Sequence, residues 1–308
     1  MAGKHFVDDG NHSELVVDAL QSLVSQHSGL VLDKANKTIY SLLHNPFKSL
    51  SLVSGGGAGH EPAHSMYVGP GMLSAAVLGN IFASPSVPQI SRCIRNVTGP
   101  HGTLVILKNY TGDIFHFQQA TQKLRAENGL RVEIVVVADD ASLGRSKVGK
   151  VGRRGLAGTV LMHKIIGAMV SMAYILDSSD EERNYVTFSE KSDVVLLVNN
   201  LGSLSVLEVS AITTIVLRQL RKLGFQPKRI YSGTYMTSLN GPGFSITLLN
   251  ADMEMLTYLD APTLAPGWVN TLSAAPDPSS VLSKIIETNG QDNSMGMLTG
   301  PKGAARQS

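Results

Sequence analysis

The stretch Leu50-Ser-Leu-Val-Ser-Gly-Gly-Gly-Ala-Gly-His-Glu-Pro62 joins a short apolar run to a run of small residues that ends at a histidine. The apolar run Leu50–Val53 predicts a buried strand, and every residue between Ser54 and His60 is glycine or alanine. Glycines directly after a strand let backbone N–H groups approach a ligand closely and point toward it. The stretch therefore predicts a small-molecule site that presents His60 at the carboxyl end of a strand. A purely structural turn is the alternative.

Two common phosphate-binding patterns do not fit this stretch. Counted from Gly55, a dinucleotide fingerprint requires a glycine where His60 stands, and a P-loop requires Gly-Lys-Ser/Thr from the same position onward. A second stretch, Gly144-Arg-Ser-Lys-Val-Gly-Lys-Val151, has P-loop spacing, but Val151 replaces the Ser or Thr that would hold Mg²⁺. We interpret it as a basic surface loop, with a nucleotide-binding module as the remote alternative.

Short apolar runs alternate with helical patterns along most of the chain. The runs predict strands at Leu50–Val53, Thr103–Leu107, Val132–Ala138, Val194–Val198, Arg229–Tyr235 and Ser245–Leu249. The helical patterns lie at Ser13–His27, Phe117–Glu127, Gly155–Val170 and Val206–Leu223. This alternation predicts an α/β fold with largely parallel sheets flanked by helices.

A second polar loop follows the predicted strand Thr103–Leu107. It reads Lys108-Asn-Tyr-Thr-Gly-Asp113 and supplies a cation, an amide, a phenol and a carboxylate. Asp113 and His60 would form a workable acid–base pair around a polar ligand, because a histidine with a near-neutral pKa can take a proton from a hydroxyl. The alternative for Asp113 is that it caps the helix that follows.

Composition excludes several classes of protein. The net charge of +2 is too small to indicate a nucleic-acid or membrane-surface partner. The single cysteine, Cys93, cannot form an internal disulfide. No apolar run approaches the length of a membrane span, no secretory signal is visible, and the histidines lack the partners of a zinc site. We therefore expect a cytoplasmic protein without a metal site of its own.

Several motifs, in order along the chain, resemble the first domain of the dihydroxyacetone (glycerone) kinases. The resemblance spans about residues 4–268 and looks most like the fungal members. It is carried by Ser54–Pro62, Phe82-Ala-Ser-Pro85, Lys108–Asp113, Gly152-Arg-Arg-Gly155 with Gly158-Thr-Val-Leu161, Leu197-Val-Asn-Asn-Leu-Gly202, and Gly233–Leu239 with Gly243–Leu249.

The resemblance implies a fold, a site and a role in glycerol metabolism. It implies a glycine-loop substrate-binding subdomain at 1–190, a second, shortened α/β subdomain at 191–268, and a linker with a disordered tail at 269–308. It implies that a triose such as dihydroxyacetone is held and phosphorylated, with His60 as the general base. The substrate-binding positions are Gly57, Ala58, Gly59, His60, Lys108 and Asp113. Ala58 stands where the family often has serine, and Ser84 lies in a motif near the pocket.

The chain departs from the family in two respects. The family anchors its substrate covalently on a second histidine, in a Gly-Ile-His-x-Glu-Pro-Gly segment that this sequence lacks. The resemblance breaks near Ser171 and resumes near Ala173, so several dozen family residues are missing there. The nucleotide-binding domain is also missing, so we expect ATP and Mg²⁺ only through a partner chain. The expected function is therefore a dihydroxyacetone kinase-like protein that is inactive alone, pairing with a nucleotide-binding chain or as a homodimer. A non-catalytic triose-sensing or kinase-pairing paralogue is the alternative.

Overall fold

A computed structural model of the protein describes residues 12–140, 151–171, 193–222 and 224–269. All of these belong to one compact unit, Met1–Thr271. The basic loop 144–150, the break near residue 172 and the tail 270–308 lie outside the described residues. None of the described helices is both long enough and apolar enough to cross a membrane.

The first sheet contains, among the described residues, six strands in the order β1-β2-β4-β3-β5-β6. Their bounds are β1 Leu30–Asp33, β2 Thr38–Ser41, β3 Ser51–Ala58, β4 Ala75–Ile81, β5 Thr103–Lys108 and β6 Val132–Val137. Strands β4, β3, β5 and β6 run parallel, whereas β1 and β2 pair antiparallel at one edge. The predicted fold, largely parallel sheets with flanking helices, is confirmed.

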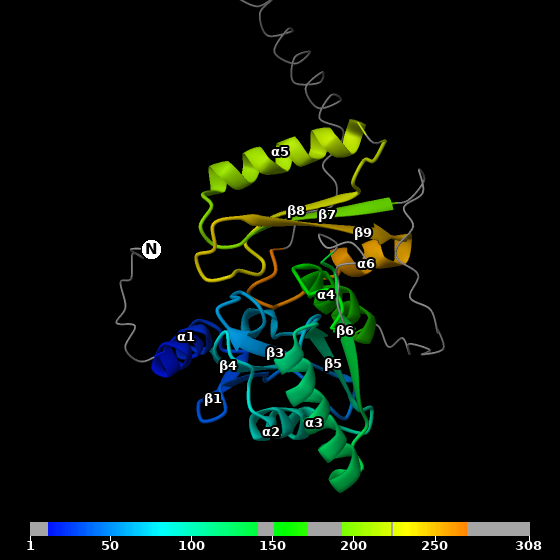
Figure 1. Cartoon of the computed structure of the whole chain (residues 1–308). Coiled ribbons are helices and arrows are strands. Elements are labelled where there is room, and N and C mark those ends of the chain that lie inside the picture. The colour runs from blue at the N-terminus through cyan, green and yellow to red at the C-terminus, as the bar shows by residue number, and fades with distance from the viewer. Residues whose placement is uncertain (1–11, 141–150, 172–192, 223, 270–308) are drawn as a thin grey trace, which may run out of the picture. The chain divides into compact units, whose positions relative to one another are not determined.

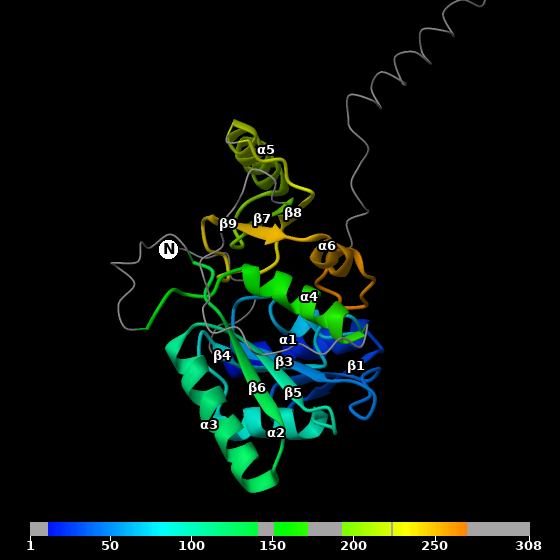
Figure 2. The same cartoon turned by 90° about the vertical axis from the view of Figure 1, so that its right-hand side faces the viewer.

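Helices cover both faces of the first sheet (Figures 1 and 2). Alternate side chains of a strand point to opposite faces, and here both faces are apolar. Leu52 and Ile106 belong to a core with α1 and α4, whereas Val53 and Val105 pack with α2 and α3. The helix bounds are α1 His12–Gln26, α2 Val87–Val97, α3 Thr111–Asn128 and α4 Gly158–Ser171. The nearly continuous apolar runs in the sequence follow from this two-sided burial.

The second sheet contains three described strands in the order β8-β7-β9. The central strand β7 (Asp193–Asn200) pairs parallel with β8 (Arg229–Gly233) and antiparallel with β9 (Phe244–Ala251). One face packs against α5 (Val206–Lys222) through residues such as Leu196 and Val198. The other face joins the large core that also contains α4 and α6 (Met253–Asp260).

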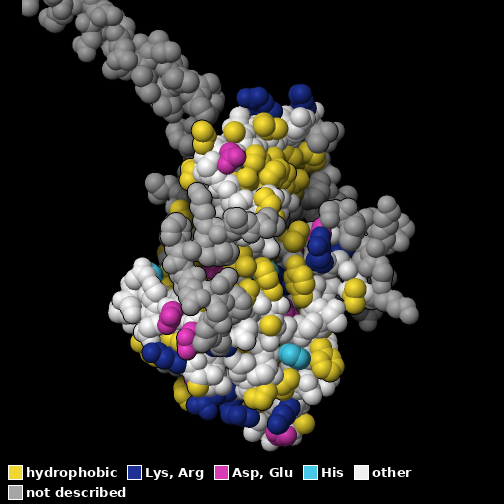
Figure 3. Space-filling view, turned by 60° about the vertical axis from the view of Figure 1, so that its left-hand side comes forward, with side chains coloured by type: hydrophobic (Ala, Val, Ile, Leu, Met, Phe, Trp, Pro, Cys, Tyr) yellow, Lys and Arg dark blue, Asp and Glu magenta, His cyan; other side chains and the backbone are white. Residues whose placement is uncertain are grey.

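The α5 face of the second sheet is covered only in part. Phe244, Ile246 and Leu248 share one face of strand β9 and are each more than a third exposed. Their register partners on β7 include the fully buried Val198 and Leu196, so α5 shields the central strand but not the edge strand. Apolar side chains gather in this upper region of the molecule in Figure 3.

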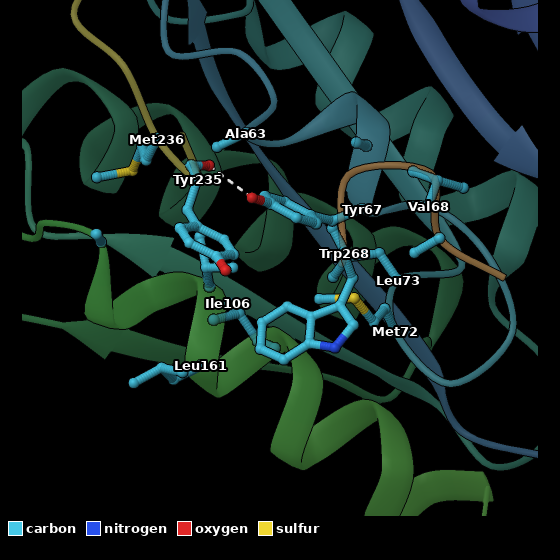
Figure 4. Packing of buried hydrophobic residues seen from close by; sticks show 14 of the residues in the cluster. Ala63, Tyr67, Val68, Met72, Leu73, Ile106, Leu161, Tyr235, Met236 and Trp268 are labelled. Atoms are coloured by element: carbon cyan, nitrogen blue, oxygen red, sulfur yellow. Dashed lines mark hydrogen bonds between the residues drawn. The ribbon is translucent and has the colours of Figure 1, made fainter. Parts of the chain in front are cut away.

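Aromatic side chains link elements that are far apart in the sequence. The Tyr67 hydroxyl donates a hydrogen bond to the Tyr235 carbonyl (2.6 Å; Figure 4). The centre of the Trp268 ring lies 5.0 Å from that of Tyr231. The buried Lys164 of α4 donates to the Tyr258 and Ala261 carbonyls at the end of α6. The second sheet is thereby held to the first sheet by specific polar bonds as well as by apolar packing.

Three boundaries predicted from the sequence need correction, and several elements were missed. The strand predicted to end at Val53 continues through the glycines to Ala58, and the helix predicted from Phe117 already begins at Thr111. The helix predicted from Gly155 begins at Gly158. Strands β1, β2 and β4 and helix α6 were not predicted, because β1 and β2 have only four residues each and β4 is interrupted by Gly79.

Candidate active site

The glycine-rich stretch is the carboxyl half of strand β3 rather than a free loop. A Cβ atom on Gly55 would lie 2.2 Å from the Val77 carbonyl oxygen of β4, and one on Gly57 would lie 2.7 Å from the Ala83 nitrogen. Neither distance is sterically possible, so glycine is required there by neighbouring backbone. Gly56 has a φ of +153°, and a Cβ there would approach the Asp113 carboxylate at 3.2 Å. The run of glycines thus brings β4 and Asp113 close to the end of β3.

His60 follows this strand and is held by a backbone carbonyl from the second sheet. Its Nδ1 lies 2.8 Å from the Thr237 carbonyl oxygen. A carbonyl can only accept, so Nδ1 carries the proton and the lone pair resides on Nε2. Burial, with a smaller effect from the Lys108 charge, lowers the pKa of His60 to about 4, although the Thr237 hydrogen bond opposes this. His60 is therefore a neutral imidazole at pH 7 with Nε2 available to take a proton.

The segment that contacts His60 is fixed by a buried amide, Asn199, at the end of β7. The Asn199 Oδ1 atom accepts from the Tyr235 and Met236 N–H groups, and its Nδ2 donates to the Met236 carbonyl. Thr237, which directly follows Met236, donates its N–H to the His60 carbonyl and its hydroxyl to the Glu61 carbonyl. The sequence motifs around Asn199 and Thr237 were part of the family resemblance, but residue-level reasoning gave neither residue a role.

Lys108 ends strand β5 and is 1% exposed. Burial lowers the pKa of its ammonium group to about 8, against the opposing charges of Asp113, Glu61 and Asp139. The group lies 5.3 Å from the centre of the Tyr110 ring and donates no hydrogen bond to any described residue. Gly155 allows close packing beside it, because a Cβ there would lie 2.8 Å from the Lys108 Cα. A buried cation with unused donors is suited to bind a ligand oxygen.

Asp113 lies in the first turn of α3 and is buried. Its Oδ1 accepts a hydrogen bond of 2.5 Å from the Ser84 hydroxyl, whereas the helix N-cap position is Tyr110. Burial raises the pKa of the Asp113 carboxyl, while Ser84 and Lys108 lower it to a smaller extent. The capping role considered for Asp113 is therefore wrong for its side chain, which points to Ser84 and Gly56 and away from the helix backbone.

The predicted site residues thus lie at the carboxyl ends of two neighbouring strands. Gly57 and Ala58 end β3 and Gly59 and His60 follow it, whereas Lys108 ends β5 and Asp113 lies in the helix that follows. Ser84 and the ring of Phe82 come from the turn after β4, with the Phe82 ring centre 5.3 Å from that of His60. Two cavities, of about 140 and 160 Å³, are lined by none of these residues. The loop that follows β6 has a structural role at its start, since Asp139 accepts from the Leu156 and Gly158 N–H groups at the beginning of α4.

Two further histidines lie in the protein interior. The His64 Nδ1 atom is 3.0 Å from the His163 Nε2 atom and 3.1 Å from the Ser54 hydroxyl oxygen. The Ser54 hydroxyl donates its own proton to the Ile106 carbonyl (2.6 Å). Burial lowers the pKa of both histidines, that of His163 to about 3. Both rings are therefore neutral at pH 7 and act as packing groups.

The profile of the Dak1 domain matches residues 21–187 and 171–267. The chain belongs to the Dak1 domain family. It is 37% identical to "Dihydroxyacetone kinase 2" of Saccharomyces cerevisiae, over 90% of this chain and 60% of that protein. It is 34% identical to human "Triokinase/FMN cyclase", over 84% of this chain and 57% of that protein.

Solved structures give the same family. A structure described as the native form of the dihydroxyacetone kinase of C. freundii aligns with a TM-score of 0.76 at 25% identity, over 98% of this chain and 64% of that one. A structure described as "Regulation of the DHA operon of Lactococcus lactis" aligns with a TM-score of 0.75 at 29% identity, over 86% of this chain and 98% of that one. These likenesses agree with the resemblance found from the sequence motifs.

This Dak1 chain is shorter than the curated kinases it matches. It spans about 60% of the length of the yeast relative. The alignment with that relative runs over 357 positions, more than the 308 residues of this chain, so the relative contains segments with no counterpart here. The two pieces of the Dak1 match overlap at residues 171–187, the region where the sequence predicts the loss of a family segment.

Proposed function

We propose that this chain binds dihydroxyacetone or a related triose at the His60 site and presents a hydroxyl group for phosphorylation. The observation that carries the proposal is the bond between the His60 Nδ1–H and the Thr237 carbonyl. It leaves Nε2 as the basic atom, at the carboxyl end of β3, beside a buried ammonium and a buried carboxylate. That combination suits removal of a proton from a hydroxyl whose oxygen becomes a nucleophile.

Each side chain has a separate part in the proposed step. The hydroxyl proton passes to His60 Nε2 as the substrate oxygen forms a bond to the γ-phosphorus of ATP, and the bond from that phosphorus to ADP breaks, so ADP leaves. The Lys108 ammonium stabilises negative charge on a substrate oxygen, and in a water-poor site this interaction is stronger than it would be in bulk water. The Asp113 carboxylate, oriented by Ser84, accepts a hydrogen bond from another substrate hydroxyl.

The phosphoryl donor is proposed to come with another chain. Within the described residues there is no group of three or more His, Cys, Asp or Glu side chains that could hold a metal ion. The described residues therefore do not fit a Mg²⁺–nucleotide site, and no step is assigned to a metal held by this chain. A nucleotide-binding partner would supply both ATP and Mg²⁺.

The experiment is a coupled phosphorylation assay with dihydroxyacetone, ATP and Mg²⁺. We expect no turnover by the chain alone and turnover when a nucleotide-binding kinase chain is added. His60→Ala should reduce the reconstituted rate at least 100-fold, about the contribution of a general base. His101→Ala, at an exposed turn residue, is the matched control and should leave the rate unchanged. Turnover by the chain alone, or an unaffected rate in His60→Ala, would contradict the proposal.

A second function, triose sensing without catalysis, is favoured by one observation. Two solved structures, each aligned over 98% of its own length, are described as concerned with regulation of the DHA operon and as the operon "co-activator Dha-DhaQ". In this second function the chain binds a triose at the same site but does not phosphorylate it. Saturable dihydroxyacetone binding with no phosphorylation, in the presence of a nucleotide-binding chain that activates another Dak1 protein, would favour it.

A further inference from the structure

Two bulky residues beside His60 adopt a backbone conformation that such residues rarely adopt. Phe82 has a φ of +52° and Leu239 a φ of +54°. In the described chain only one other non-glycine residue, Lys37 in the β1–β2 turn, has a positive φ. The left-handed region is unfavourable for large side chains, and strain of this kind gathers at functional sites. Glycine or asparagine would form either turn with less strain.

The two strained residues donate hydrogen bonds to adjacent carbonyl groups of the backbone just before His60. The Phe82 N–H donates to the Ala58 carbonyl (2.9 Å) and the Leu239 N–H donates to the Gly59 carbonyl (2.7 Å). Phe82 follows β4 of the first sheet, whereas Leu239 lies in the segment between β8 and β9 of the second sheet. Both sheets therefore meet at the residues immediately before His60.

The side chains of these residues converge over Gly59. A Cβ atom on Gly59 would lie 3.0 Å from the Phe82 ring and 3.4 Å from the Leu239 Cγ. Phe82 is 53% exposed and Leu239 is 47% exposed. About half of each residue is therefore exposed to solvent, and neither is a core residue. Both residues contact the backbone before His60, and the Phe82 ring also packs against the imidazole ring.

We propose that Phe82 and Leu239 are positioning residues that form an apolar clamp on His60. The clamp holds the imidazole on the Thr237 carbonyl and keeps water away from one side of the ring. This proposal rests on the proposed role of His60 as the base, but the clamp itself can be measured without turnover.

The test uses glycine substitutions, because glycine tolerates a positive φ and removes only the side chain. Phe82→Gly and Leu239→Gly should fold with an unfolding midpoint no lower than that of the wild type, since relief of strain offsets lost contacts. Lys37→Gly is the matched control, with the same kind of strain relief at a residue that does not touch His60. Phe82→Tyr and Leu239→Met keep the apolar contact and should behave as the wild type.

The first readout is the His60 titration, followed by NMR of the ring protons. Lys108, whose charge also lowers the His60 pKa, is unchanged in every variant. We expect the His60 midpoint to rise toward 6.5 by at least one unit in Phe82→Gly, and further in the double glycine variant, because water reaches the ring. Lys37→Gly should leave it unchanged. A folded double variant with an unshifted midpoint would overturn the clamp.

The second readout is phosphorylation with a nucleotide-binding chain present. The double glycine variant should lose at least tenfold in kcat with little change in KM, since the base and not substrate affinity is affected. If the midpoint shifts as expected but the wild type never turns over, the proposed function fails and the clamp stands. If the wild type turns over and the double variant has wild-type kcat and titration, the clamp fails and the proposed function stands.

Discussion

The two sheets of this protein differ in how completely helices cover them. The first sheet has α1 and α4 on one face and α2 and α3 on the other, and its central strands are buried on both sides. The second sheet has only α5 on its outer face among the described helices, and the apolar side of β9 is exposed there. The break in the Dak1 match at 171–187 comes directly before β7, the central strand of that sheet.

The comparison shows that the geometry around His60 depends on the segments at the strand ends more than on complete coverage of each sheet by helices. Everything that the second sheet contributes to His60 comes from the segment after β8, which Asn199 at the end of β7 holds in place. These residues lie beyond the interrupted region, so the contacts persist although the sheet is small. The second sheet therefore still orients the imidazole ring of His60.

The largest expected effect contrasts one isoleucine from each sheet. Ile106 of β5 is fully buried, whereas Ile246 of β9 is 46% exposed. Ile106→Ala should lower the free energy of unfolding by about 2–5 kcal/mol because it leaves a cavity. Ile246→Ala should change it by about 0.5 kcal/mol or less. Guanidinium denaturation measures both, and equal losses would show that β9 is covered in solution.

A smaller loss is expected from removal of the amide that connects the second sheet to the site. Asn199→Ala leaves the Tyr235 and Met236 N–H groups without their buried acceptor. The expected loss of unfolding free energy is about 2–3 kcal/mol, together with a lower affinity for dihydroxyacetone. Asn240→Ala, at an exposed position of the same segment, is the control. If Asn199→Ala is as stable as the wild type and binds dihydroxyacetone equally well, the second sheet does not hold the site in place through Asn199.

The smallest effect at physiological pH comes from the histidines. The pKa values of His60, His64 and His163 are all lowered in the folded protein, chiefly by burial. The unfolded chain therefore binds more protons below about pH 6.5, and stability should fall as the pH drops from 6.5 toward 4. Each histidine adds a slope of up to about 1.4 kcal/mol per pH unit. Denaturation at pH 7, 6 and 5 checks this, and His163→Gln should reduce the slope.

The rate should also depend on pH in an unusual range if the proposed function holds. With a His60 pKa of about 4, the base stays neutral well below the pH at which an ordinary histidine becomes protonated. With a Lys108 pKa of about 8, the cation is lost above that pH. The rate of the reconstituted enzyme should therefore fall below about pH 4 and above about pH 8. An acid limb near pH 6.5 would mean that His60 is solvated.

The sequence predicted the fold class and proposed His60, Lys108 and Asp113 as site residues, but it did not predict the contacts that orient these side chains. Buried strands leave apolar runs, and His60, Lys108 and Asp113 stand at strand ends where ligands bind. The bond from His60 to Thr237 joins residues 177 positions apart, and no local pattern encodes it. The glycine run predicts a close approach of backbone N–H groups to a ligand, whereas the structure shows that Gly55 and Gly57 are required by neighbouring protein backbone. The left-handed backbone of Phe82 and Leu239 has no signature in their residue types.

The most direct test of the account is an NMR titration of dihydroxyacetone into the protein at pH 7, with the histidine ring signals as the reporter. We predict that the His60 signals shift saturably while those of exposed His101 stay fixed, and that Lys108→Met weakens the response. If the His60 and His101 signals both stay fixed, or shift to the same extent, the chain has no triose site at His60.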